Sequence, residues 1–317
     1  MNENAPHTPI PPFVPLKLVK DAVRTVFSTS TEDLDERRSA MAVLEAADMH
    51  CTPEEYTAFY TAGTELAPEE VARAVETQPI LYFYEAAFDK VKRELETTPV
   101  APDTAVLWHV YNMGYVVRTQ DSCFALDLHH RRSEELIPFL DFIVVTHDHT
   151  DHKTARLLDG FAKTGKPVIS NFYPHTGFSA TPRTLKLGSV VLHTCITDHN
   201  PKHRGFVQPC EIEIPCPSRK IVIFTGGDTY DPKQFKMHNP DVDAFIVHPR
   251  VGLVVTEAQK IVEPRLTLIS HLLEMHHYHD QWRWGFDVGF DELEKSRAAG
   301  RAAAIPLWGD RIVLAAR

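Results

Sequence analysis

The chain has 317 residues, of which 43% are hydrophobic and 24% are charged, and its formal net charge is −10 at pH 7. This length allows one large domain or two smaller ones with a buried core, and the composition is typical of a soluble globular protein. No apolar run approaches the length of a membrane span, no signal-peptide pattern is visible, and the scattered cysteines predict free thiols and a cytoplasmic location.

The N-terminal third is predicted to form a Pro-rich lead and a helical cap. The lead runs from Pro6 to Pro15 and is expected to be extended. Pro53 and Pro68 each precede a pair of glutamates, which indicates helices that begin with proline at the first position. Residues 80–95 form an amphipathic helical pattern. Its aromatic side chains are expected to pack in a core rather than to line a substrate entrance.

The charge of this region differs from that of the remainder. Residues 1–100 carry 18 Asp or Glu against 9 Lys or Arg, a net charge of −9. An acidic surface disfavours nucleic acid as a substrate, although it is compatible with a small phosphorylated molecule. Residues 97–102 are the expected linker, so the predicted domains are residues 1–100 and 101–317. The sequence leaves open whether the cap stabilises the fold or acts as a lid.

Strand patterns dominate after the linker and are interspersed with helical patterns. Such a chain is predicted to form an α/β fold with two sheets and helices outside them. Strands are expected at residues 105–110, 114–119, 122–128, 142–147, 167–170, 187–197, 205–214, 219–225, 243–247 and 266–270, and helices at 151–164, 255–262 and 291–303.

The most informative motif is His-Asp-His-Thr-Asp-His at residues 147–152, directly after the apolar run 142–145. Buried imidazoles and carboxylates must be paired or coordinated, because an isolated polar group in a dry interior costs several kcal/mol. Imidazole and carboxylate are also the ligands that suit zinc, manganese and iron. The motif therefore predicts a metal site at a strand end rather than a solvated loop.

Three later segments offer further ligands of the same types. Each is an apolar strand pattern that ends in histidine or aspartate, namely at His199, Asp228 and His271. Asp228 follows a Gly-Gly turn, which would expose its carboxylate. His193 and His203 lie close to His199, and His203 is the alternative to it as a ligand.

The order of these motifs resembles the metallo-β-lactamase superfamily, from residue 105 to the C-terminus. Within it, the chain is most similar to the lineage of ascorbate-phosphate lactonase and the N-acyl-phosphatidylethanolamine phospholipases D. The hairpin sequence at 107–117, the strand that ends at Asp127 and the closing stretch 305–314 carry this similarity. The resemblance implies an αββα sandwich with an N-terminal helical extension.

The resemblance also implies a dinuclear site of two divalent metal ions, zinc or manganese, with iron as an alternative. Asp127 would support the metal loop, and Asn112 stands where the lineage has a hairpin histidine. Asp151, which would orient the attacking water, and His271 are the expected catalytic residues. The first ion would be bound by His147, His149 and His199, the second by Asp151, His152 and His271, with Asp228 bridging both.

Three functions are compatible with these residues. The first is a dinuclear metal-dependent hydrolase that cleaves a small-molecule ester, lactone or phosphoester. The second is a lipid-type phosphodiesterase of the same fold, and the third is a non-catalytic metal-binding sensor or scaffold. Serine hydrolysis and nucleotide-dependent phosphoryl transfer lack their motifs. Whether the protein forms a homo-oligomer is left open.

Two further histidine clusters have no assigned role. His276, His277 and His279 either line the pocket or form a solvated loop. The sequence His-His-Arg-Arg at 129–132 is expected to be a basic surface turn.

Overall fold

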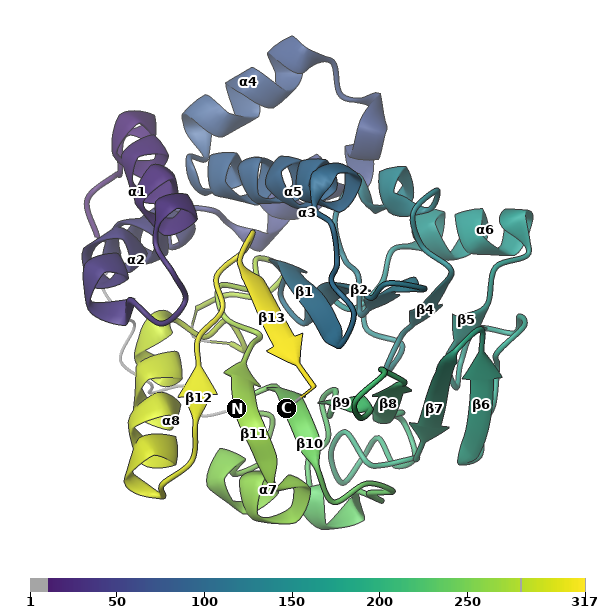
Figure 1. The fold of residues 1–317 in the computed structure, drawn as a ribbon. Coiled ribbons are helices and arrows are strands. Elements are labelled where there is room, and N and C mark those ends of the chain that lie inside the picture. Colours follow the sequence, from purple (N-terminus) through teal and green to yellow (C-terminus); the bar gives the residue numbers. More distant parts are fainter. Residues whose placement is uncertain (1–10, 280, 317) are drawn as a thin grey trace.

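The computed structural model describes residues 11–279 and 281–316 and consists of two β-sheets packed face to face, with helices on their outer sides (Figure 1). This arrangement confirms the predicted αββα sandwich. The helices are α1 (Leu16–Ser28), α2 (Leu34–Asp48), α3 (Pro53–Ala62), α4 (Pro68–Thr77), α5 (Ile80–Thr97), α6 (Ala155–Thr164), α7 (Val255–Val262) and α8 (Phe286–Ala298).

The first sheet has six strands in the order β13-β1-β2-β3-β4-β5, and the second has seven in the order β12-β11-β10-β9-β8-β7-β6. The strands are β1 (Thr104–Tyr111), β2 (Gly114–Arg118), β3 (Cys123–Leu126), β4 (Phe142–Val144), β5 (Val168–Ile169), β6 (Arg183–Leu187), β7 (Val190–Thr194), β8 (Cys210–Ile214), β9 (Ile221–Thr225), β10 (Val242–Val247), β11 (Pro264–Ile269), β12 (Ala303–Ala304) and β13 (Arg311–Ala315). Strands β9 to β12 run parallel to one another, as do β3 to β5.

The period-two alternation of the strands divides their side chains between two cores. Ala105 and Leu107 of β1 contribute to the core between the sheets, as do Ile221 and Ile223 of β9. The intervening residues, such as Trp108, pack into a second core beneath the helices. Successive side chains of a strand point to opposite faces, so central strands such as β1 and β9 are buried on both faces.

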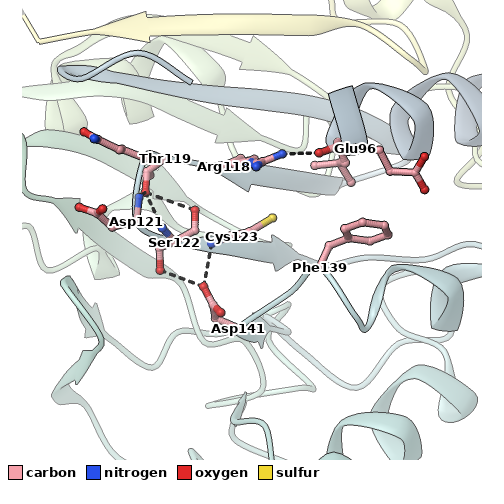
Figure 2. Close-up of a pocket in the computed structure, with 10 residues that line it drawn as sticks. Glu96, Arg118, Thr119, Asp121, Ser122, Cys123, Phe139 and Asp141 are labelled. Carbon is pink, nitrogen blue, oxygen red and sulfur yellow. Dashed lines mark hydrogen bonds between the residues drawn. The ribbon is translucent and has the colours of Figure 1, made fainter. Parts of the chain in front are cut away.

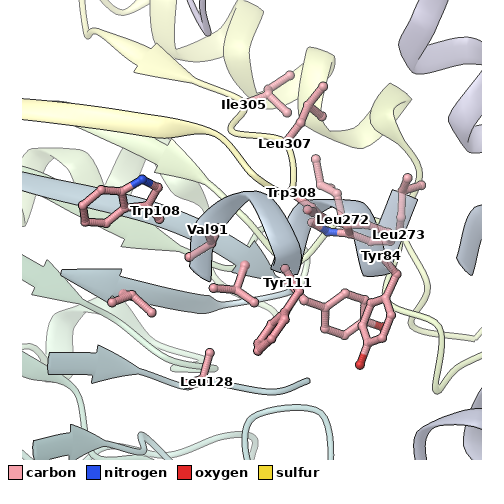
Figure 3. Packing of buried hydrophobic residues seen from close by; sticks show 14 of the residues in the cluster. Tyr84, Val91, Trp108, Tyr111, Leu128, Leu272, Leu273, Ile305, Leu307 and Trp308 are labelled. Atoms are coloured by element: carbon pink, nitrogen blue, oxygen red, sulfur yellow. The ribbon is translucent and has the colours of Figure 1, made fainter. Parts of the chain in front are cut away.

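The N-terminal helices cover the outer face of the first sheet. Figure 3 shows Tyr84 and Val91 of α5 among Trp108, Tyr111 and other buried side chains. The indole nitrogen of Trp108 donates a hydrogen bond to Glu94 at 2.9 Å. The buried core of the helices is therefore continuous with that of the sheet, and core packing of the α5 aromatics is confirmed.

Three of these elements were not expected from the sequence: helix α1 and the strands β6 and β12, the last of which begins at the end of the predicted helix 291–303. Helix α1 begins directly after Pro15 and buries Val19, Ala22, Val23 and Val26, a spacing of three and four residues that is the signal for a helix. The alternating edge strand β6 was also missed. Part of the Pro-rich lead, residues 6–10, lies outside the described residues. None of the described helices is long and apolar enough to cross a membrane.

The prediction of a basic surface turn at 129–132 is wrong. His129 and His130 are fully buried, because helices α3 and α5 cover them. The ring of His130 is stacked between those of Tyr84 and Phe88, at centroid distances of 3.9 and 4.1 Å. The partners come from a distant part of the chain, so nothing in the local sequence indicated this burial.

Candidate metal centre

The predicted ligands meet where strands of both sheets end. Asp228 follows β9, His271 follows β11, and the loop that starts at His147 follows β4 of the other sheet. Because β9, β10 and β11 are parallel neighbours, their carboxyl ends lie at the same edge of the second sheet. Residues far apart in the sequence are thereby brought together around Asp228.

The first group of side chains is formed by His147, His149, His199 and Asp228, whose ligand atoms lie within 4.8 Å of one another. Nε2 of His147 lies 3.6 Å from Asp228 Oδ2, and Nε2 of His199 lies 3.5 Å from the same oxygen. The alternative ligand, His203, is outside this group.

The second group consists of Asp151, His152 and His271. Oδ2 of Asp151 is 3.0 Å from His271 Nε2 and 3.5 Å from His152 Nε2. Nε2 of His152 is also 3.4 Å from Asp228 Oδ1. Asp228 therefore directs one oxygen to each group, as a bridging carboxylate would.

Gly227 permits this close approach of the two sheets. Its φ is +51°, and a Cβ at this position would lie 2.8 Å from the Cβ of Thr146. Glycine adopts positive φ without steric cost and leaves room for the neighbouring backbone. The Gly-Gly turn thus brings Asp228 against the loop that carries His147.

Asp127 supports this loop from beneath. It is fully buried and accepts hydrogen bonds from the backbone N–H of Thr146 at 2.7 Å and from its hydroxyl at 2.8 Å. Its Oδ2 lies 3.3 Å from Nδ1 of His152. A carboxylate beside one ring nitrogen of a histidine directs the lone pair of the other nitrogen toward a metal.

Asn112, in the turn between β1 and β2, positions Asp151. Its side-chain amide donates to the backbone oxygen and to Oδ2 of Asp151, at 3.0 and 3.1 Å. The backbone carbonyl of Asn112 accepts from the backbone N–H of His271 at 3.3 Å. Asn112 therefore connects two members of the second group.

The electrostatics of the cluster are those of a cation site. Burial would raise the pKa of the Asp228 carboxyl, but the imidazoles of His248 and His152 outweigh it and hold this pKa well below its ordinary value. Burial lowers the pKa of His149 to about 4, so this imidazole is neutral and can act as a ligand. Burial also disfavours a proton on His152, yet Asp151 and Asp228 raise its pKa well above the usual range. A bound cation would replace that proton.

The donor set fits a metal ion. Within the described part of the chain, Nε2 of His147 and Nε2 of His152 are buried without a hydrogen-bond partner, although both lie near carboxylates. Buried polar atoms are normally satisfied. Imidazole nitrogens that converge with carboxylate oxygens without forming hydrogen bonds are arranged as metal ligands.

A cavity of about 400 Å³ opens above the cluster. His149, Asp151, His199, Asp228 and His271 form its floor. Its walls are formed by Asn200, Tyr230, His248, Arg250, Val251, Gly252, His277 and Trp282. A substrate in this cavity would reach the candidate ligands directly.

Three further residues lie near the cluster, and the ligand set implied by the resemblance includes none of them. His248 and His277 line the cavity, and Glu274 is fully buried behind His277. The Nδ1 of His277 donates to Glu274 at 2.5 Å, and this hydrogen bond raises the pKa of His277. His248 follows an apolar strand pattern directly, as His271 does, and this signal could have identified it.

The other histidines of the 276–279 segment face away from the cavity. His276 packs against the ring of Tyr56 at 4.7 Å, and His279 lies 2.9 Å from Asp48. Of these three histidines, His277 therefore lines the cavity, whereas His276 and His279 connect the segment to helices α3 and α2.

A separate cavity of about 330 Å³ lies at the turn between β2 and β3 (Figure 2). Its polar groups bond to one another: Asp141 accepts from the hydroxyl of Ser122 at 3.2 Å and from the backbone of Cys123 at 2.8 Å. It shares no residue with the metal-binding groups. We attribute no chemistry to it.

Comparisons with known proteins identify the fold. No protein-family profile and no curated protein matches the sequence. A metallo hydrolase of the archaeon Ignicoccus hospitalis matches with a TM-score of 0.52 at 14% identity, over 68% of this chain and 100% of that chain. The metallo-β-lactamase fold protein YhfI of Bacillus subtilis matches with a TM-score of 0.47 at 14% identity, over 67% and 100% of the two chains. The diiron β-hydroxylase CmlA of Streptomyces venezuelae matches with a TM-score of 0.48 at 12% identity, over 68% of this chain and 55% of that chain.

The chain has an αββα sandwich fold, and it shares this fold with the metallo hydrolase of Ignicoccus hospitalis. At these identities the likeness concerns the fold alone, since proteins of one fold carry out different reactions.

Proposed function

We propose that the protein is a dinuclear metal-dependent hydrolase that cleaves a small-molecule ester, lactone or phosphoester. The observation that carries this proposal is the convergence of two His/Asp groups on Asp228 at the floor of a cavity. Two divalent ions held by these groups would supply an activated water and stabilise the charge that develops on the attacked centre. Zinc and manganese suit the donor set, with iron as the alternative.

The protein's own residues have distinct tasks in this reaction. Asp151 is held by Asn112 and lies at the cavity floor, where its carboxylate can orient the attacking water and accept its proton. His277 is fixed by Glu274 through Nδ1, which leaves Nε2 to hydrogen-bond to the substrate. His271 holds Asp151 from the other side.

The cavity supports a small substrate over a lipid. Ligand pockets span roughly 300–1,000 Å³, and 400 Å³ lies near the lower end of that range. Of the aromatic residues that a lipid-type enzyme could use as an acyl groove, those of α5 pack in the core, whereas Trp282 lines the cavity. A lactonase or phosphoesterase resembling the ascorbate-phosphate lactonase branch is therefore favoured over the phospholipase branch.

The test is metal analysis followed by a substrate panel. Protein purified without chelator would be analysed for metal per chain by mass spectrometry, then assayed on short-chain lactones, aryl esters, aryl phosphates and a lipid phosphodiester. We expect about two ions per chain and turnover of a small substrate that a chelator abolishes. Full metal content with no turnover on any class would favour the sensor or scaffold, and turnover of the lipid alone would favour the phospholipase alternative.

A further inference from the structure

His248 occupies a position in the cluster that the seven expected ligands do not include. It follows β10 directly, between the strand ends that present Asp228 and His271, and is only 5% exposed. Its Nδ1 lies 2.9 Å from Asp228 Oδ1. The same oxygen lies 3.4 Å from His152 Nε2, so it is shared by two imidazoles.

The ring of His248 is parallel to that of His271. The ring centroids are 3.6 Å apart and the interplanar angle is 2°. Ligand atoms of Asp228, His248 and His271 lie within 4.8 Å of one another, which makes them a further group able to hold a metal ion. The two stacked imidazoles thus contact neighbouring carboxylates: His248 lies against Asp228 and His271 against Asp151.

We propose that His248 is an additional ligand of the second metal ion, which would then have five protein donors instead of four. This inference rests on the proposed dinuclear site and extends it. The donors are Asp151, His152, His271, Asp228 and His248, whereas the first ion has His147, His149, His199 and Asp228.

The competing role for His248 is that of a positioning residue whose Nδ1–H donates to Asp228. In that role the proton would occupy the space between Nδ1 and Oδ1, beside the oxygen that His152 also approaches. A carboxylate that binds a metal ion can also accept such a hydrogen bond, so a measurement of metal binding is needed to separate the two roles. The other ring nitrogen, Nε2, has no hydrogen-bond partner among the described residues. The position of the His248 ring therefore depends on its stacking against His271 and on the contact of its Nδ1 with Asp228.

Five donors make the two metal positions unequal. Zinc prefers four ligands in tetrahedral geometry, whereas manganese and iron accept sites with more oxygen and nitrogen donors. The first group, with three imidazoles and one shared carboxylate, suits zinc. The second group, with two carboxylates and three imidazoles, shifts the relative preference toward manganese or iron.

The experiment measures metal binding instead of turnover. The full-length protein would be stripped with a chelator and titrated with Co²⁺, Zn²⁺ and Mn²⁺, in the wild type and in His248→Ala and His248→Asn. Two affinities would be obtained by competition with an indicator, and the Co²⁺ absorption would report coordination number, because it intensifies as the number of ligands falls. His193→Ala is the matched control, since His193 pairs with Glu213 outside both groups.

We expect His248→Ala to lower the affinity for one of the two metal ions by more than about 100-fold. Loss of a residue that only positions a ligand lowers metal affinity by about 10–100-fold. The Co²⁺ spectrum of that site should intensify, while the other site and the control stay unchanged. The Asn variant separates the two roles, because its amide can still donate to Asp228 but is a poor ligand. Its affinities and spectrum should therefore resemble those of the Ala variant.

Two results would overturn the assignment. One is a Co²⁺ spectrum that neither substitution changes, and the other is restoration of wild-type affinity by His248→Asn, which would make His248 a positioning residue. Should His248→Ala fail to fold, the Asn variant still decides between the roles. A wild-type protein that binds no ion would instead refute the proposed metal site itself.

Discussion

Asn112 donates from one amide group to both the backbone oxygen and the carboxylate of Asp151, at 3.0 and 3.1 Å. It does so from a turn with φ of +54°, a conformation that asparagine tolerates better than most residues. The hairpin of the first sheet thereby fixes a carboxylate of the metal loop.

Replacing Asn112 with alanine should lower the affinity for the second metal ion by about 10–100-fold, because Asp151 loses the partner that orients it. The affinity would be measured by chelator competition. Asn239→Ala is a matched control, since Asn239 is also buried and also donates to a carboxylate, that of Glu211. Equal metal affinities in wild type and Asn112→Ala would show that Asp151 holds its position without this amide.

Replacing Asp228 with asparagine should lower the metal content of the purified protein to less than one ion per chain. A single carboxylate that contacts both groups cannot be substituted by a neutral amide without exposing the ions to mutual repulsion. Asp148→Asn provides the comparison, because Asp148 belongs to the same motif but is paired with Lys153 at 2.9 Å. Full metal content in Asp228→Asn would rule out the bridging role.

Substituting Gly227 by alanine should destabilise the protein by roughly 2–4 kcal/mol, because strain at positive φ adds to a clash. The added Cβ would meet Thr146 at 2.8 Å. Gly188→Ala separates the two effects, since Gly188 has a similar φ of +59° but open space around it. The free energies of unfolding, measured with denaturant, should differ by at least about 1 kcal/mol between the two variants. Equal values would mean that the clash is relieved by movement of the loop.

Acidification should destabilise the fold through His129 and His130. Burial lowers the pKa of His129 to about 3 and that of His130 well below its ordinary value. In the unfolded chain both histidines become protonated with a pKa near 6.5, whereas in the folded protein they stay neutral. The free energy of unfolding is therefore unaffected by their protonation above about pH 6.5 and decreases as the pH falls below that value. His130→Asn should flatten the slope of unfolding free energy against pH, measured between pH 6 and 5, by up to about 1.4 kcal/mol per unit. An unchanged slope would mean that His130 is protonated in the folded protein.

Trp282 should contribute to substrate binding without affecting the metal ions. It lines the cavity and is 60% exposed, so its ring is available to a ligand. Trp282→Ala should raise KM by roughly 3–10-fold at unchanged kcat and metal content, since it removes apolar contact and no catalytic group. Phe178→Ala, an exposed aromatic residue outside the cavity, should leave KM unchanged. A fall in kcat alone would place Trp282 in the chemical step.

The local patterns predicted most of the fold because they reflect properties of single elements. The alternation of β1 and the apolar runs before residues 147, 228 and 271 identify strands and their ends wherever they lie in the molecule. Helix α1 was missed although its spacing was visible, and β6 was missed because an exposed edge strand has a weak apolar signal.

The candidate site depended on the order of strands. The sequence could rank His199 above His203, but only the tertiary structure brings His199 to 3.5 Å from Asp228. The sequence places His248 at a strand end, but its proximity to His271 follows from the parallel pairing of β10 with β11, which only the tertiary structure shows.

The sequence by itself determined most of the helices and strands, the kind of ligand and the strand ends that present most of the ligands, since these follow from periodicity and from the chemistry of imidazole and carboxylate. The αββα arrangement was implied by the family resemblance. The tertiary structure decided the rest: which side chains converge, that Asn112 holds Asp151, and that residues 129–131 are core rather than surface. These features depend on contacts between residues more than twenty positions apart. No local pattern records such contacts, because their geometry is set by the packing of whole elements.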